Sequence, residues 1–270
     1  MNTLDTAIII VNHDNKRSIP LLIESIYKFN NLENSKIYFI QNQKSEYIKK
    51  YLRKFDQDIV LIENEVGKGC AANINYGIKI ANEQFDVNSF LILNPDLVMK
   101  SEMLNSFRNL ADSDDKIGMI GPKLLNDDGT LQFSCRKFST IKHIIIRMFR
   151  LNWLPWASEI ENNTLMTNFD HNSRREVDWI VGAVMFFKKS LIDKLGYFDE
   201  KNFRPIYGED QDICLRIWRN NLKVIYEPKI ICSHSYPRRG SSLFLSSYSF
   251  FQLRSTINLF RKWNFNLTRK

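Results

Sequence analysis

The chain has 270 residues, of which 44% are hydrophobic and 25% are charged, and its formal net charge is +8. These proportions are those of an ordinary globular protein and exclude long disordered stretches. The positive charge admits three classes of partner, which are nucleic acids, anionic membrane surfaces and phosphorylated small molecules. The basic residues concentrate at 136–150 and 238–270.

Cysteine spacing and the absence of long apolar runs bear on the compartment. The four cysteines lie far apart without a C-x-x-C pair, which favours reduced thiols in a cytosolic protein over a zinc ribbon or a disulfide scaffold. The first residues lack a signal-peptide pattern, and no apolar run reaches the roughly 18 residues that span a bilayer. We therefore expect a cytoplasmic protein that meets a membrane only at its surface. The cysteines are Cys70, Cys135, Cys214 and Cys232.

The first half of the chain alternates short apolar runs with amphipathic stretches. This alternation predicts an α/β fold with a mainly parallel sheet covered by helices on both faces. Ligands of such sheets bind at the carboxyl ends of the strands, so the loops that follow the strands are the candidate site. Strands are expected at 7–11, 36–40, 58–62 and 89–93, and helices at 19–29, 45–54 and 70–82.

The second half is less regular, and no Gly/Ser-rich or Pro-rich linker interrupts it. We therefore expect one domain with a C-terminal extension. Strands are expected at 117–125, 130–133, 177–187, 224–226 and 230–232, and helices at 141–149, 209–220 and 242–262.

A single carboxylate follows the fourth expected strand, which ends in Asn94-Pro95-Asp96. Proline cannot continue a central β-ladder, so the strand stops and Asp96 projects at the ligand-binding edge. A lone carboxylate there is a poor proton-transfer group but a good partner for Mg²⁺ or Mn²⁺ that bridges to a diphosphate. The alternative is a helix cap, in which Asp96 starts a helix near Ser101.

The helix expected at 209–220 carries a carboxylate on its apolar face. Asp210 lies three and four residues before Ile213 and Cys214, so it points with them toward the interior, whereas Asp212 points elsewhere. The free amides and the dipole of the first turn are expected to keep Asp210 ionised, which suits a general base. The alternative is an N-terminal helix cap.

Two further segments contain candidate ligands. His234 follows a short strand and suits a metal ligand, and Arg238 with Arg239 suits phosphate oxygens, although lone histidines are more often structural and adjacent arginines are often solvated. Residues 67–72 fit the pattern G-x-G-x-x-[GA] of dinucleotide-binding turns. They form the third strand-to-helix turn rather than the first, and no acidic residue follows at the expected distance. A nicotinamide or flavin enzyme is therefore the weaker alternative.

Taken together, these segments resemble the inverting family 2 glycosyltransferases of the GT-A fold, and among them the bacterial rhamnosyltransferases of O-antigen and capsule assembly. The likeness covers nearly the whole chain, from Ala7 to about Phe260, and rests on motifs in a fixed order. The matching segments are the first strand at 7–12, the G-x-A-x-x-x-N-x-G helix at 69–77, L-N-P-D at 93–96, V-D-W-x-x-G at 177–182 and G-E-D-x-D-x-C-L-R at 208–216.

The resemblance implies a GT-A catalytic domain at 1–240, with a nucleotide-binding half at about 1–125 and an acceptor half at about 126–240, followed by a C-terminal basic helix at 241–270. It implies a nucleotide-sugar donor, a Mg²⁺ or Mn²⁺ ion and a single displacement with inversion. The roles that it implies are catalytic base for Asp210; metal ligands for Asp96 and His234; nucleotide-sugar binding for Asn12, Gln41, Gly69, Asn75, Asn94, Asp96, Arg238 and Arg239; and acceptor binding for Asp178, Glu209 and Trp179, the last as an apolar platform for a sugar.

Two positions depart from the family pattern. Gln41 stands where the family usually has an aspartate that contacts the pyrimidine base, and Gly67 stands where it usually has an asparagine. Neither change affects Asp96 or Asp210, so we expect an active enzyme rather than a catalytically dead, glycan-binding relative. The resemblance favours L-rhamnose from dTDP-rhamnose as the donor, while galactofuranose or a hexose from UDP would require the same residues.

Basic amphipathic segments suit attachment to a membrane. The apolar face of 141–149 continues into Trp153 and Trp156, and the last helix has an apolar face from Phe250 to Phe260 beside basic residues. We expect peripheral attachment to the inner, anionic face of the cell membrane, where a lipid-diphosphate-linked glycan acceptor lies. Core packing or a homodimer contact is the alternative. A nucleic-acid-binding protein, the rival suggested by the charge, has no recognition motif here.

Overall fold

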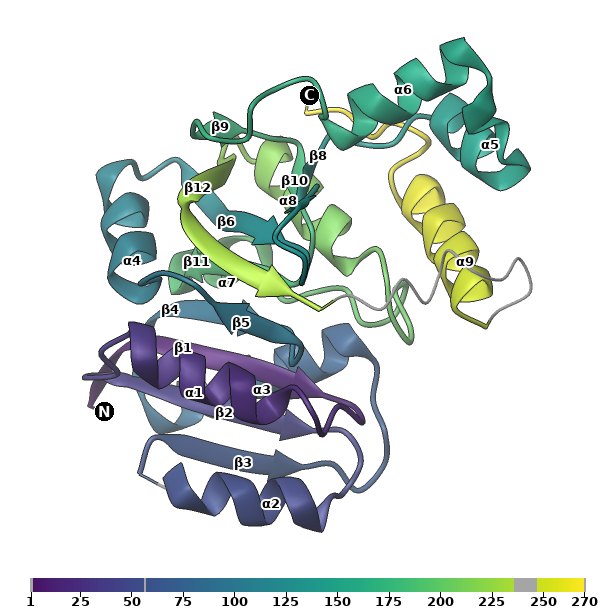
Figure 1. Cartoon of the computed structure of the whole chain (residues 1–270). Coiled ribbons are helices and arrows are strands. Elements are labelled where there is room, and N and C mark those ends of the chain that lie inside the picture. Colours follow the sequence, from purple (N-terminus) through teal and green to yellow (C-terminus); the bar gives the residue numbers. More distant parts are fainter. Residues whose placement is uncertain (1, 56, 236–246, 270) are drawn as a thin grey trace.

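The computed structural model describes residues 2–55, 57–235 and 247–269. One twisted sheet runs through the molecule, and its main path has the strand order β3-β2-β1-β4-β11-β6-β12-β5 (Figure 1). The strands of this path are β1 (Thr3–Asn12), β2 (Ser35–Gln41), β3 (Ile59–Glu63), β4 (Asp86–Leu93), β5 (Leu97–Met99), β6 (Ile117–Leu125), β11 (Val184–Lys188) and β12 (Lys223–His234).

The first half of the chain matches its expected pattern. Strands β1 to β4 pair in parallel, and their carboxyl ends meet at one edge because Asn12 lies opposite Gln41 and Ile10 lies opposite Leu93. This confirms the mixed, mainly parallel α/β fold. The helices that connect these strands are α1 (Ile19–Phe29), α2 (Glu46–Leu52) with a short 3₁₀ turn at Arg53–Phe55, and α3 (Cys70–Gln84).

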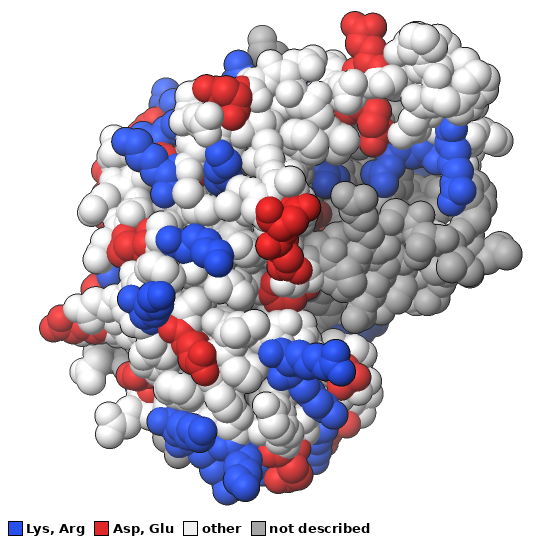
Figure 2. All heavy atoms as spheres, viewed as in Figure 1, with Lys and Arg blue, Asp and Glu red and all other residues white. Residues whose placement is uncertain are grey.

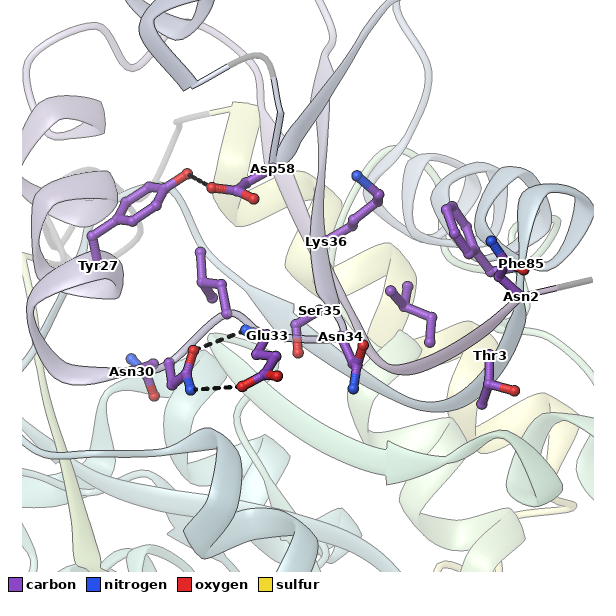
Figure 3. A pocket seen from close by; sticks show the side chains of 13 residues that line it. Asn2, Thr3, Tyr27, Asn30, Glu33, Asn34, Ser35, Lys36, Asp58 and Phe85 are labelled. Atoms are coloured by element: carbon purple, nitrogen blue, oxygen red, sulfur yellow. Dashed lines mark hydrogen bonds between the residues drawn. The ribbon is translucent and has the colours of Figure 1, made fainter.

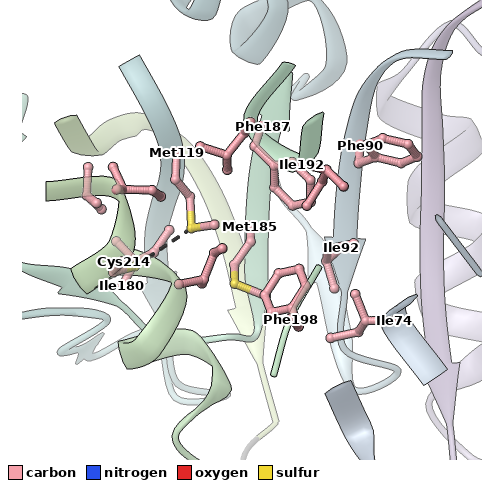
Figure 4. Packing of buried hydrophobic residues seen from close by; sticks show 14 of the residues in the cluster. Ile74, Phe90, Ile92, Met119, Ile180, Met185, Phe187, Ile192, Phe198 and Cys214 are labelled. Atoms are coloured by element: carbon pink, nitrogen blue, oxygen red, sulfur yellow. Dashed lines mark hydrogen bonds between the residues drawn. The ribbon is translucent and has the colours of Figure 1, made fainter. Parts of the chain in front are cut away.

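Helices cover both faces of the sheet because the buried strands carry apolar side chains on each side. One core lies under α1, α2 and α4 (Leu104–Ser113). The other lies under α3, α7 (Lys189–Leu195) and α8 (Glu209–Arg219), where Met119, Met185 and Phe187 pack together (Figure 4). Helix α7 was not among the expected elements, and α4 was considered only as the helix near Ser101 in the alternative for Asp96.

The acceptor half differs from its expected pattern in two strands. The single strand expected at 177–187 is divided into β10 (Trp179–Ile180) and β11, because the backbone N–H groups of Val181 and Gly182 donate to Ser134 and Asp210 instead of to a neighbouring strand. The two strands expected at 224–226 and 230–232 are one strand, β12, with an irregularity between Glu227 and Ile231. The smaller strands are β7 (Leu131–Gln132), β8 (Cys135–Arg136) and β9 (Arg175–Glu176).

A helical excursion separates β8 from β9. It consists of α5 (Ile141–Phe149), a 3₁₀ turn at Leu151–Trp153 and α6 (Pro155–Leu165), which project from one corner of the molecule (Figure 1). Thr140 caps α5 by accepting a hydrogen bond from the His143 backbone N–H. The expected helix at 141–149 is confirmed, whereas α6 was not expected.

The last helix, α9 (Ser247–Lys262), packs on the catalytic domain through Asp212. This carboxylate was expected to point away from the interior, yet it is fully buried and lies 2.8 Å from Lys262 Nζ. It also accepts a hydrogen bond of 2.9 Å from Trp263 Nε1 and pairs with Arg216 at 3.1 Å. A buried carboxylate is tolerated when charged partners surround it, and here these partners join α8 to the C-terminal segment.

The cysteine side chains form no disulfide bonds. All four cysteines are free thiols, and Cys135, Cys214 and Cys232 are buried. Within the described residues, no helix combines the length and the apolar character that crossing a membrane requires.

Candidate active site

Asp96 lies just beyond the carboxyl end of β4, where Pro95 ends the strand. Its side chain is 16% exposed, and its Oδ1 is buried without a hydrogen-bond partner among the described residues. No helix starts at Asp96, since the short strand β5 follows it directly and α4 begins only at Leu104. The helix-cap alternative is therefore wrong.

His234 faces Asp96 from the end of β12. Strand β5 pairs with β12 so that Leu97 lies opposite His234, and this places His234 Nε2 3.3 Å from Asp96 Oδ1. The other ring nitrogen, Nδ1, lies 2.7 Å from Gln132 Oε1. An amide oxygen only accepts, so Nδ1 carries a proton and Nε2 directs its lone pair, or a second proton, at the carboxylate.

This arrangement fits a divalent cation. A buried carboxylate oxygen and an imidazole nitrogen converge on one point, and the second ring nitrogen donates to a carbonyl oxygen, as metal-bound histidines usually do. In the absence of a metal ion, a proton on Nε2 makes the same contact an ion pair. Over the described part of the chain, no third His, Cys, Asp or Glu joins the pair.

Asp210 lies in the first turn of α8 and points at the break between β10 and β11. The Gly182 N–H donates to its Oδ2 at 3.0 Å, and the Gln211 N–H donates to its Oδ1 at 2.8 Å. Two successive residues with positive φ, Tyr207 at 79° and Gly208 at 93°, turn the chain into α8. A side chain at Gly208 would collide with the Phe203 ring, so glycine fits this turn.

Burial raises the pKa of Asp210 above its ordinary value, against the opposing effects of the Gly182 and Gln211 amides and of the Arg136 guanidinium. Desolvation thus outweighs the backbone donors of the first turn, which were expected to favour the ionised form. A carboxylate with a raised pKa is a stronger base once it is ionised.

Glu209, the neighbour of Asp210, is buried more deeply. Burial and the adjacent Asp210 charge raise its pKa to about 8. Its carboxylate is hydrogen-bonded to the Cys70 thiol, while its Oε2 has no partner among the described residues. Because ionisation of one carboxyl raises the pKa of the other, the two carboxyls hold a proton more readily than two separate ones would.

Backbone contacts bring Asp96 and Asp210 to the same edge of the sheet. Strand β11 runs antiparallel to β4, and the Asn94 N–H donates to the Ala183 carbonyl at 2.9 Å. Ala183 follows Gly182, which holds Asp210. A short path thus joins the residue two before Asp96 to the residue that positions Asp210, so both carboxylates lie at the same edge of the sheet.

Asn12 and Gln41 lie at the adjacent ends of β1 and β2. Asn12 Nδ2 donates to Gln41 Oε1 at 2.8 Å, and Gln41 Nε2 donates to the Gln43 carbonyl. Both side chains are buried, and the Gln41 amide is used within the protein. In this geometry, Asn12 and Gln41 therefore support the loop at the carboxyl ends of β1 and β2.

A neighbouring amide network was not expected from the sequence. Asn42 Oδ1 accepts hydrogen bonds from Asn64 Nδ2, Asn73 Nδ2 and the Lys68 backbone N–H, at 3.0, 3.1 and 2.7 Å. The Asn42 amide group lies 2.9 Å from His13 Nδ1. Three buried asparagines thus tie together the loops after β1, β2 and β3, and the sequence signal available for them was only a repeated asparagine after successive strands.

Gly69 and Asn75 join α3 to the segment before α8. A Cβ at Gly69 would lie 2.9 Å from the Pro205 carbonyl oxygen, and the Cys70 N–H donates to that oxygen at 2.8 Å. Asn75 makes hydrogen bonds of 2.8 and 3.0 Å to the backbone of Phe198. These contacts use the Asn75 amide for packing, so its nucleotide-binding role stays a prediction that they do not support.

Asp178 and Trp179 also lie within the protein's own contacts. Asp178 accepts from the Phe138 N–H at 2.8 Å and pairs with Arg269 at 2.6 Å. Trp179 is 5% exposed, and its Nε1 donates to the Lys137 carbonyl at 3.0 Å. A ring this buried offers no face to a sugar. Trp179 therefore contributes to packing in the interior of the protein.

Arg238 and Arg239 lie outside the described residues. An open depression of about 640 Å³ is lined by the first residues of β1 and β2, at the edge opposite to the candidate site (Figure 3). Its labelled side chains, among them Asn30, Ser35 and Asp58, show no link to Asp96 or Asp210. Ligands of parallel sheets bind at the carboxyl ends of the strands, so the site is assigned to that edge.

Comparison with known proteins identifies the chemistry. Residues 5–249 match the family described as "Glycosyltransferase like family 2". The chain belongs to this family. It is therefore a glycosyltransferase.

Three relatives with curated names match this glycosyltransferase at low identity. Rhamnosyltransferase WbbL of Escherichia coli K12 is 26% identical over 254 residues, which are 92% of this chain and 90% of WbbL. Hexosyltransferase Agl10 of low-salt glycan biosynthesis in Haloferax volcanii is 25% identical over 244 residues, 90% of this chain and 71% of Agl10. The N-acetylglucosaminyl-diphospho-decaprenol L-rhamnosyltransferase of Mycobacterium tuberculosis is 23% identical over 182 residues, 60% of this chain and 56% of that relative.

Solved structures share the fold. GalNAc-T7 with UDP, GalNAc and Mn²⁺ superposes with a TM-score of 0.64 at 14% identity, covering 90% of this chain and 46% of that one. Mannosyltransferase PcManGT of Pyrobaculum calidifontis with GDP-Man and Mn²⁺ gives 0.62 at 14% identity, covering 97% of this chain and 64% of that one. The glycosyltransferase thus spans about half of the first chain and about two thirds of the second. Both are GT-A enzymes, and the likeness confirms the GT-A fold.

Proposed function

We propose that this glycosyltransferase moves a sugar from a nucleoside-diphosphate donor to a hydroxyl of a lipid-diphosphate-linked glycan, with inversion at the anomeric carbon. The proposal rests on one observation, which is that two different pairs of side chains lie at the same edge of the sheet. Asp96 with His234 suits a diphosphate-bound cation, and Asp210 beside Glu209 suits a base. A single displacement needs one group for the leaving diphosphate and one for the nucleophile.

Asp210 acts on the acceptor. As the acceptor oxygen attacks the anomeric carbon, its proton passes to a carboxylate oxygen of Asp210. The bond between the anomeric carbon and the diphosphate oxygen breaks at the same time, and the nucleoside diphosphate leaves from the opposite face. The Gly182 amide fixes the orientation of Asp210, and the raised pKa strengthens it as a base.

Asp96 and His234 are the residues that would hold a divalent cation, Mg²⁺ or Mn²⁺. When bound, the ion offsets negative charge on the leaving group. Gln132 fixes the His234 tautomer that leaves Nε2 available to the ion. The Mn²⁺ present in the GalNAc-T7 and PcManGT structures supports this part of the proposal.

The donor nucleotide lies along the edge formed by Asn12, Gln41 and the Asn42 network, with Arg238 and Arg239 as candidate partners of the diphosphate. The nucleotide UDP and the nucleotide sugar GDP-Man in the neighbouring structures support a nucleotide at this edge. On the acceptor side, Glu209 and Asp178 shape the opening through the segments they hold. The diphospho-decaprenol acceptor named for the mycobacterial relative supports a lipid-linked acceptor here.

The proposed donor is dTDP-L-rhamnose, which the two rhamnosyltransferase relatives support. A hexose from UDP is the second candidate because Agl10 is a hexosyltransferase, and galactofuranose would require the same residues. A thermal-shift screen with dTDP-rhamnose, UDP-galactose, UDP-galactofuranose and GDP-mannose, each with Mn²⁺, separates these donors.

The product then tests the mechanism. Transfer from the stabilising donor to a short diphosphate-linked acceptor, followed by NMR of the new anomeric linkage, gives the stereochemistry. We expect the opposite anomer to that of the donor. Retention of configuration would overturn the single displacement, and the absence of transfer from every donor would overturn the proposed activity.

A further inference from the structure

Six large apolar side chains are exposed on the excursion formed by α5, the turn at Leu151–Trp153 and the start of α6. Their exposed fractions lie between 41% and 76%. Four of them follow the spacing i, i+4, i+7 and i+8 and therefore share one side of α5. We call these residues the α5 surface: Ile141, Ile145, Met148, Phe149, Trp153 and Trp156.

The fold does not need this face to be apolar. The opposite side of α5 faces the protein through His143 and Ile146, both buried. His143 Nε2 lies 2.7 Å from Glu161 Oε2 of α6, which fixes how α5 is rotated. Monomeric proteins rarely expose this many neighbouring large apolar side chains without a partner. The orientation of α5 thus exposes the α5 surface to solvent.

The charges around the α5 surface favour an anionic partner. From Gly129 to Ser158 the sequence contains no Asp or Glu. Exposed basic residues flank the stripe, and Figure 2 shows Lys and Arg side chains beside the largely uncharged corner that α5 and α6 form. The acidic Glu161 is paired with His143, and Glu159 lies on α6. The basic residues of this stretch are Arg136, Lys137, Lys142, Arg147 and Arg150.

We propose that the α5 surface docks on an anionic lipid leaflet. Apolar and tryptophan side chains suit the boundary between headgroups and acyl chains, where the amphipathic indole is favoured. Basic residues beside them suit the negative surface potential of phosphatidylglycerol or similar lipids. A second copy of this chain, which would carry the same positive charge, fits this surface less well.

The α5 surface is joined directly to the acceptor half. Strand β8, which leads into α5, pairs with β10, and the Phe138 N–H donates to Asp178. Strand β10 runs on to Gly182, which holds Asp210. Docking would therefore hold the opening at Asp210 close to the leaflet. This consequence rests on the proposed lipid-linked acceptor, whereas the docking itself does not.

The test uses the full chain and vesicles of phosphatidylcholine with or without phosphatidylglycerol. We expect co-sedimentation with the anionic vesicles at low salt, a decrease at high salt, and a blue shift of tryptophan fluorescence. The double variant Phe149→Ser/Trp153→Ser should lower the partition coefficient at least about tenfold. The matched control is Leu21→Ser, since Leu21 is 55% exposed on α1; it should bind as the unaltered chain does.

Each other outcome counts against docking. If the unaltered chain stays in the supernatant, or if the double variant binds as tightly as the control, the proposal is wrong. If light scattering shows a dimer that the double variant alone disrupts while vesicle binding is unchanged, the surface belongs to a second copy. Transfer to a water-soluble acceptor without vesicles should be equal in both variants, so a failure of the proposed activity is visible separately.

Discussion

The Asp96–His234 pair and the Glu209–Asp210 pair border the same edge of the sheet but lie in different surroundings. In the first pair, a carboxylate oxygen of Asp96 lies 3.3 Å from a ring nitrogen of His234. The other ring nitrogen is hydrogen-bonded to Gln132. In the second, two carboxyls are adjacent along one helix, and burial raises the pKa of both. In the proposed mechanism the first pair binds a cation, whereas the second joins two carboxyls that compete for a proton.

This difference separates the two tasks of a displacement reaction. A carboxylate oxygen and an imidazole nitrogen that face one point suit a metal ion, because both atoms can coordinate it. A carboxylate beside a second buried carboxyl binds a proton more readily, because loss of both protons would place two charges in a poorly solvated space. In the proposed mechanism, the same residue type therefore serves the leaving group in one pair and the nucleophile in the other.

The largest effect is expected from Asp210→Asn, which removes the base and keeps its shape. Turnover should fall by about 10² to 10⁴, the range that general-base catalysis contributes. Donor binding, measured as thermal stabilisation, should remain, because Asp210 lies on the acceptor side. Steady-state kinetics with the preferred donor measures this. If turnover stays near that of the unaltered enzyme, Asp210 is not the base. The proposed contrast between the two pairs then fails as well.

Asp96→Ala should act through the cation instead. We expect a fall in turnover of about 10² or more, together with loss of Mn²⁺ binding in isothermal titration calorimetry. Asp210→Asn is the matched control, since it should bind Mn²⁺ normally. Treatment of the unaltered enzyme with a chelator should reproduce the Asp96→Ala loss and be reversed by added Mn²⁺. Equal Mn²⁺ affinity in both variants would contradict the division of roles.

The local features of the site were predictable, because they depend on neighbours in the sequence. Pro95 ends β4 and so places Asp96 at the edge, and the 3.6-residue period of α8 places Asp210 on its inner side. The parallel half of the sheet followed from the alternation of strands and helices in the same way.

Features that depend on distant partners were not predictable. Trp179 is buried because β8 pairs with β10 across more than forty residues, and Asp212 is buried because α9 returns to cover it. The raised pKa of Asp210 depends on burial by several elements together, whereas the helix start that favours its ionisation is visible in the sequence. Gln132 reaches His234 only because Leu124 of β6 lies between β7 and β12.

Gln132→Leu tests whether the hydrogen bond from His234 to Gln132 fixes the orientation of the histidine. Without its acceptor at Nδ1, the ring loses its fixed tautomer, and Mn²⁺ affinity should fall by about 10- to 100-fold. Turnover at saturating Mn²⁺ should largely recover, which a merely structural role would not produce. Gln132→Glu, which keeps an acceptor, is the control and should retain the affinity. If the Leu and Glu variants bind Mn²⁺ equally, Gln132 does not position His234.

The smallest effect concerns the second pair and appears as a pH dependence of stability. The pKa of Glu209 in the folded protein, about 8, lies above its ordinary value of 4.5. The folded state therefore holds a proton that the unfolded state releases, so this contribution to stability is complete below about pH 4.5 and is lost as the pH rises to about 8. Glu209→Gln has no proton to lose at this position. The free energy of unfolding of the unaltered chain, relative to that of Glu209→Gln, should therefore fall by on the order of 3 kcal/mol across this window.

Urea denaturation at a series of pH values measures the difference. Glu63→Gln, a change at a partly exposed carboxylate at the end of β3, is the control and should run parallel to the unaltered chain. Parallel curves for Glu209→Gln as well would mean that Glu209 is ionised at neutral pH. Asp210 would then act beside a full negative charge, and the contrast between a cation-binding pair and a proton-sharing pair would no longer hold.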